Sequence, residues 1–132
     1  MTTSPVPPAP RFPEQLQERL ITFAAAVCTS ARRLPRDVAT APMIDQVVRS
    51  ATSVAANYAE ARAAQSRRDF VHKMQVCLKE LRETRMWLEL LRRTGAPPTI
   101  GALAAECDGL TGIFVTSINT ARRGLRRTST PN

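Results

Sequence analysis

Residues 66–93 read SRRDFVHKMQVCLKELRETRMWLELLRR, and this stretch decides the fold. Its apolar side chains recur at spacings of three and four, which is the repeat of one face of an α-helix. The stretch opens on Ser66 and Asp69, a hydroxyl and a carboxylate three residues apart, which predicts a capping box. The stretch ends on two arginines, and Gly95 and two prolines follow it, which together predict a helix stop. The predicted buried face consists of Phe70, Met74, Cys77, Leu78, Leu81, Leu88 and Leu91.

Three further segments show the same repeat. The first starts after Pro13 and ends at Pro35, the second opens on Thr40 as a possible N-cap and runs to about Gln65, and the last begins near Ile100. No segment alternates with period two over the length of a strand. Four amphipathic helices joined by short breaks predict an all-α fold, an antiparallel up-and-down four-helix bundle. Two glycines in the last segment either weaken that helix or let a neighbouring helix approach closely: Gly109 and Gly112.

One domain accounts for the length of the chain. Residues 1–13 hold five prolines and are predicted to be a disordered tail, residues 14–127 form the bundle, and residues 128–132 form a second tail. The tail lacks the pattern of a signal peptide, and the longest apolar stretch is too short to span a bilayer. The odd number of cysteines and their apolar surroundings favour reduced thiols in a core, which predicts a cytoplasmic protein. They are Cys28, Cys77 and Cys107.

The charge is strongly basic. Nineteen Lys and Arg against eleven Asp and Glu give a net charge of +8 and a sequence pI near 10.9, which favours polyanionic partners. Only two of the nineteen are Lys, so a biased codon composition is the alternative explanation. Arginines at the ends of the first and third helices suit the helix dipole, whereas four at the end of the last helix exceed that need. The predicted nucleic-acid-binding residues are Arg122, Arg123, Arg126 and Arg127, followed by Arg92 and Arg93. Because no aromatic residues are interleaved with them, binding should tolerate any sequence and depend on salt.

Catalytic and metal-binding patterns are missing from the sequence. His72 is the only histidine, so its Asp-x-x-His spacing with Asp69 has no counterpart on a second helix, as a di-iron bundle needs. Cys77 lies five residues from His72 and therefore on a different helix face. The five glycines are scattered singly and form no phosphate-binding loop. We therefore expect no enzymatic activity, no metal and no cofactor.

Polar side chains follow the apolar faces of the second and third helices. Two such stripes either meet as a hydrogen-bonded network or subunit interface, or they form a solvated face. The expected donors to the carboxylates are Arg82, Arg85 or Asn57. Trp87 widens the apolar arc of the third helix, which predicts an oligomer unless its own chain covers it. The predicted network or interface residues are Ser53, Asn57, Glu60, Glu80, Glu83 and Trp87, with Ser50, Asp69, His72 and Val76 on the same stripes.

Three motifs in combination resemble a known family. They are SATSVAANYAEA at residues 50–61, SRRDF at residues 66–70 and LKELRETRMWLELL at residues 78–91, and IFVTSINT at residues 113–120 also fits. The chain resembles the four-helix bundle proteins encoded in intervening sequences of 23S rRNA genes, which share a fold with the accessory variability protein of diversity-generating retroelements. The resemblance covers about residues 14–127.

This resemblance implies a ring-like homopentamer without catalytic activity or cofactor, which acts as a scaffold with basic surfaces for RNA or DNA. In the retroelement branch it also implies contact with a reverse transcriptase. Asn57, Glu60, Glu80 and Glu83 match motif positions, which favours the network over the solvated face. The leading hypothesis is an oligomeric scaffold that binds nucleic acid, most simply RNA. The alternative is a protein-interaction scaffold, and binding to a membrane surface is less favoured because the bundle core uses the apolar faces.

Overall fold

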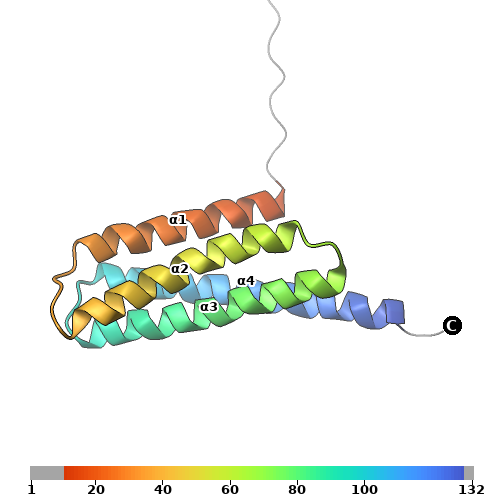
Figure 1. Cartoon of the computed structure of the whole chain (residues 1–132). Helices are drawn as coiled ribbons and strands as arrows, with labels where there is room; N and C mark the ends of the chain where they lie inside the picture. Colours follow the sequence, from red (N-terminus) through yellow and green to blue (C-terminus); the bar gives the residue numbers. More distant parts are fainter. Residues whose placement is uncertain (1–10, 130–132) are drawn as a thin grey trace, which may run out of the picture.

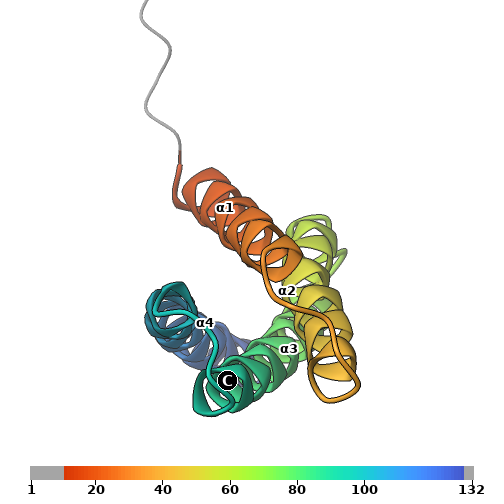
Figure 2. The same cartoon turned by 90° about the vertical axis from the view of Figure 1, so that its left-hand side faces the viewer.

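Four antiparallel α-helices form the part of the chain that the computed structural model describes, residues 11–129. They are α1 (Phe12–Arg32), α2 (Thr40–Arg62), α3 (Arg67–Arg93) and α4 (Thr99–Ser129). The helices run alternately up and down (Figure 1), and each contacts the two that lie beside it around the bundle (Figure 2). No strand occurs in this part of the chain. The predicted all-α four-helix bundle is confirmed.

The helices extend slightly beyond the predicted domain limits. Helix α1 begins at Phe12 because Pro13 sits in its first turn, where the missing N–H of proline has no intrahelical partner to lose. Helix α4 continues to Ser129 and projects past the start of α3 (Figure 1). The rest of the two predicted tails, residues 1–10 and 130–132, lies outside the described residues.

Local signals set the helix ends. Ser66 caps α3, because its hydroxyl accepts a hydrogen bond from the Asp69 N–H at 3.0 Å. The reciprocal half of the predicted capping box is not formed within the described residues, where the Asp69 carboxylate pairs with Lys73 instead. At the start of α2 the prediction was wrong: Thr40 is already helical, and Asp37 accepts from the N–H groups of Ala39 and Thr40, both at 2.9 Å. Asp37 fulfils this role because the loop after Pro35 brings its carboxylate under the first turn. Gly95 ends α3 with a φ of +95°, a conformation that glycine adopts without strain.

The core lies along the axis between the four helices and is aliphatic. Every predicted apolar face contributes to it, although Phe70 and Leu78 are only half-buried and Val71 takes a core position that the periodicity missed. The rings of Tyr58 and Phe114 meet edge to face, with their centroids 5.8 Å apart, and join α2 to α4. The most deeply buried large side chains are Phe23, Phe114, Leu20, Met74, Leu81, Leu88, Leu91, Ile100 and Leu110.

The structure excludes one of the two roles expected for Gly109 and Gly112 in α4. A Cβ at Gly112 would meet open space, and one at Gly109 would meet the side-chain ends of Arg19, 3.2 Å away, and Glu106, 3.8 Å away, so neither glycine serves the close approach of a neighbouring helix. Close approach occurs instead at Gly124, where a Cβ would collide with the guanidinium of Arg67. Gly124 thus leaves room for the Arg67 side chain, which reaches from the first turn of α3 to the last turns of α4.

The cysteines are free thiols, and two of them are fully buried. Burial raises the pKa of Cys77 and of Cys107 to about 12, and their Sγ atoms lie 3.8 Å and 3.2 Å from the carbonyls of Val54 and Leu81. Cys28 departs from the predicted core position, because it is only half-buried at the edge of α1.

This difference predicts selective thiol labelling. At pH 8 a thiol with a pKa of about 12 is ionised in about one molecule in 10,000, and burial excludes the reagent as well. A chromogenic disulfide reagent should therefore modify Cys28 in the folded protein and reach Cys77 and Cys107 only after urea is added. If all three thiols reacted at one rate in the native protein, the buried placement of the other two would be wrong.

None of the helices in residues 11–129 combines the length and the apolar character that crossing a bilayer requires.

Candidate nucleic-acid interface

A basic groove runs between α3 and α4. It has a volume of about 500 Å³ and is lined by Gln75, Leu78, Lys79, Arg82, Val115, Ile118, Asn119 and Arg122. We call these eight residues the α3–α4 groove. The four groove residues of α3 are three, one and three positions apart in the sequence, and the four groove residues of α4 have the same spacings. Residues at such spacings lie along one edge of a helix, so each helix lines the groove with one continuous edge.

The floor of the groove is apolar and its rims are polar. Ile118 is buried and Leu78 and Val115 are half-buried, which gives the aliphatic stems of Lys79 and Arg82 a surface to lie along. The charged ends of these long side chains stay in water. This arrangement holds cations at the rim without burying their charge.

The cations of the groove are not neutralised within the described part of the chain. Lys79, Arg82 and Arg122 make no ion pair there, and the amides of Gln75 and Asn119 make no hydrogen bond there. Three positive charges and two amides thus face one groove with their donors unused. Such a set suits an extended anion such as a nucleic-acid backbone.

The predicted arginines separate into two places. Arg122 lines the groove, and the other three of its cluster follow on the last turns of α4, where Arg123 donates to Thr120 Oγ1 at 3.4 Å. Arg92 and Arg93 lie at the opposite end of the bundle, at the end of α3 (Figure 1). The structure therefore does not join the two predicted groups into one surface.

Arg92 and Arg93 are also neutralised locally. Both donate to Glu89, at 2.6 Å and 2.9 Å, and Arg85 adds a contact at 3.3 Å. Hydrogen bonds from these guanidinium groups, first that of Arg92, hold the pKa of Glu89 far below its usual value. A nucleic acid would have to compete with this carboxylate, so we rank Arg92 and Arg93 below the groove.

Sequence reasoning missed four polar residues of the groove: Gln75, Lys79, Arg82 and Asn119. The spacing of Gln75, Lys79 and Arg82 on one helix edge was a usable signal, but they form no run in the sequence. Only the packing of α4 beside α3 brings Arg122 next to them.

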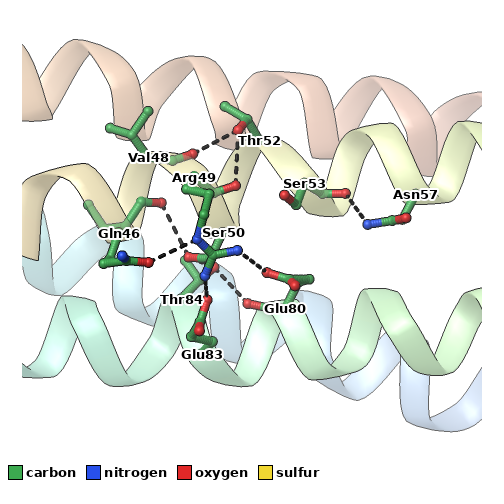
Figure 3. Close-up of polar contacts among 11 residues, drawn as sticks. Gln46, Val48, Arg49, Ser50, Thr52, Ser53, Asn57, Glu80, Glu83 and Thr84 are labelled. Atoms are coloured by element: carbon green, nitrogen blue, oxygen red, sulfur yellow. Dashed lines mark hydrogen bonds and ion pairs between the residues drawn. The ribbon is translucent and has the colours of Figure 1, made fainter.

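The predicted polar stripes meet at Arg49, a residue that the sequence analysis did not single out. Its guanidinium reaches from α2 to α3 and forms ion pairs with Glu80, at 3.3 Å, and with Glu83 (Figure 3). The expected donors Arg82, Arg85 and Asn57 do not fill this role: Arg85 pairs with Asp108 and Glu89.

The other members of the stripes lie apart from Arg49. Asn57 donates to the Ser53 carbonyl one turn earlier, at 2.9 Å, and Glu60 is exposed (Figure 3 shows the first pair). Asp69 pairs with Lys73, and His72 is exposed. Within the described residues, no three His, Cys, Asp or Glu side chains gather as metal ligands would.

A buried hydroxyl pair lies beneath Arg49. Thr84 Oγ1 lies 2.8 Å from Ser50 Oγ and 2.8 Å from the carbonyl oxygen of Glu80. Ser50 and Thr84 are both fully buried. This pair fixes the register of α2 against α3 inside an otherwise apolar core.

The outer face of α3 exposes apolar side chains. Met86 and Leu90 are 47% and 39% exposed, and Trp87 beside them is half-buried. The Trp87 Nε1–H is buried and has no hydrogen-bond partner among residues 11–129. Met86 and Leu90 thus stay exposed in a single chain, whereas Trp87 packs against the core of its own chain, which was the alternative to an oligomer at this position.

A second, apolar groove opens at the end of the bundle where α1 starts. Its volume is about 880 Å³, and all four helices contribute to it, with Leu16, Tyr58, Phe70 and Met74 among its lining residues. Arg62 and Arg67 lie at its edge. We call it the end groove.

The comparisons with known proteins agree with this fold. A family model described as 23S rRNA-intervening sequence protein matches residues 15–110. A crystal structure of a protein of unknown function from the S23 ribosomal protein family of Bacteroides thetaiotaomicron shares 30% identity, with a TM-score of 0.74, and the match covers 81% of this chain and 97% of that chain. No curated protein matches the chain significantly.

Proposed function

The chain belongs to the 23S rRNA-intervening sequence protein family, and we propose that it is a non-catalytic oligomeric scaffold that binds RNA through the α3–α4 groove. The observation that carries this proposal is the convergence of Lys79, Arg82 and Arg122 without a carboxylate partner in the described part of the chain. The net charge of +8 supports it, because a basic surface raises the association rate with polyanions. Arg126, four residues after Arg122, continues the same edge of α4, and Arg123 and Arg127 add positive charge on the neighbouring side of its last turns.

The proposed scaffold assembles from several copies, and the resemblance described above points to a homopentamer. Met86 and Leu90 supply exposed apolar area for such a contact. We place the working location in the cytoplasm, where RNA and reduced thiols occur together. The proposal involves no metal and no cofactor.

A protein-interaction scaffold is the second candidate function. The end groove favours it, because an apolar surface that includes Arg67, a cation without an ion pair in the described part of the chain, suits an amphipathic acidic segment of a protein partner. An accessory role beside a reverse transcriptase, as in the related retroelement proteins, would belong to this class.

Size exclusion coupled to light scattering tests the leading proposal. At low salt we expect a multimer of several chains with bound nucleic acid, seen as excess absorbance at 260 nm over 280 nm. The nucleic acid should leave as salt rises, since each phosphate contact releases counterions. Leu90→Glu should reduce the multimer to smaller species, with Ile21→Glu on an equally exposed site of α1 as control. A monomer free of nucleic acid at low salt would overturn the proposal and favour the protein-interaction scaffold.

A further inference from the structure

We infer that the α3–α4 groove recognises double-stranded RNA, because the free amides of Gln75 and Asn119 line it together with the cations Lys79, Arg82 and Arg122. This inference rests on the proposed RNA binding and names the class of RNA. Three features support it. The groove has no aromatic side chain on which an unpaired base could stack, its polar residues stand on two rigid helices, and its two amides lie beside the cations.

The groove offers no aromatic ring to an unpaired base. Phe23, Phe114 and Tyr58 are buried in the core, and Phe70 faces the end groove. Trp87 lies beyond the groove on the outer face of α3. Proteins that bind single-stranded RNA stack its bases on aromatic side chains, so the lining of this groove is poorly suited to a single strand.

The polar groups of the groove stand on two rigid helices. Along α3 the edge continues from Arg82 back through Lys79 and Gln75 to His72 and Arg68, all at spacings of three and four. From Arg68 to Arg82 the helix makes 14 steps of about 1.5 Å each, so the edge is about 21 Å long. Neighbouring helices lie about 8–10 Å apart, so α4 sets a second row beside the first. Two stiff parallel rows suit the fixed phosphate positions of a duplex better than a strand that must bend to follow them.

The two amides of the groove can accept hydrogen bonds, which a cation cannot do. A side-chain amide both donates and accepts hydrogen bonds, and so does the 2′-hydroxyl of ribose. Gln75 is half-buried and Asn119 is exposed, and neither is hydrogen-bonded within the described part of the chain. When the neighbouring cations hold the phosphates, these amides would be in reach of the sugars of the same backbone. DNA lacks the 2′-hydroxyl, so the amides should favour RNA.

Fluorescence anisotropy with three labelled probes tests the inference. The probes are a duplex RNA of about 16 base pairs, the length that a small double-stranded-RNA-binding domain covers, one of its single strands, and the DNA duplex of the same sequence. At one salt concentration the wild-type protein should bind duplex RNA about tenfold more tightly than either other probe.

A double variant isolates the amides. Gln75→Met with Asn119→Leu should bring the affinity for duplex RNA close to that for duplex DNA, while the DNA affinity and the salt dependence stay unchanged. Circular dichroism and the elution volume check that the variant folds, which is expected because neither side chain is buried. Gln15→Met with Gln65→Met, at exposed sites outside the groove, is the matched control.

The outcomes separate this inference from the proposed function. Equal binding of duplex and single-stranded RNA would overturn the inference and leave RNA binding in place. Equal binding of RNA and DNA duplexes, or a double variant that keeps its RNA preference, would overturn the role of the amides. Binding to none of the three probes would overturn the proposed function itself.

Discussion

Replacing Lys79, Arg82 and Arg122 together with Gln should lower the affinity for RNA about a hundredfold at 0.1 M salt. Each phosphate contact contributes about 0.7–0.9 to the slope of log K against log salt, so three contacts account for roughly two logarithmic units at this salt concentration. Gln keeps much of the length and polarity of the replaced side chains and removes only the charge. Because none of the three makes an ion pair in the described part of the chain, folding should be unaffected.

The measurement is a titration of labelled RNA at several salt concentrations. The triple variant should show a slope shallower by about 2–3 than the wild type. The control is Arg32→Gln, Arg33→Gln, Arg36→Gln, which removes the same charge at the opposite end of the bundle. If control and triple variant lost affinity equally, net charge and not the groove would govern binding. An unchanged slope in the triple variant would exclude the groove altogether.

The fold was predictable because its signals are local. The helical repeat, the Ser66 cap and the Gly95 stop act within a few residues of one another, and the structure confirms each of them. Asp37 was missed because Thr40 carries the usual capping hydroxyl, whereas the path of the loop decides which oxygen reaches the N–H groups.

The candidate site was predictable only in part, because it depends on how helices are rotated against each other. Arg122 stands in a visible run of arginines, but its partners in the groove come from another helix. In the same way Arg49 meets Glu80 and Glu83 only once α2 and α3 are packed. The ion pairs of Glu89 are different, because they form within one helix. Glu89 stands three and four residues before Arg92 and Arg93, a spacing from which their pairing can be predicted.

Phe114→Ala should lower the free energy of unfolding by about 3–5 kcal/mol, the range for a fully buried phenylalanine. The ring joins α4 to Tyr58 of α2, and its removal leaves a cavity at the centre of the bundle. Single domains are stable by only about 5–15 kcal/mol, so this loss takes a large share of the total. Urea unfolding at a fixed protein concentration measures it, because assembly makes stability depend on concentration.

The control for this variant is Ile21→Ala. Because Ile21 is 46% exposed on α1, this substitution should lower the free energy of unfolding by well under half as much. A loss below about 1 kcal/mol for Phe114→Ala would mean that α4 does not dock through this ring. Because Phe114 lies in the core and outside the α3–α4 groove, the molecules that remain folded should keep the wild-type salt dependence of RNA binding. The triple variant of Lys79, Arg82 and Arg122 should show the opposite result, with unchanged stability and weaker RNA binding. The reason is that α4 packs in the core through one face, which includes Phe114, and lines the groove with another, which includes Arg122.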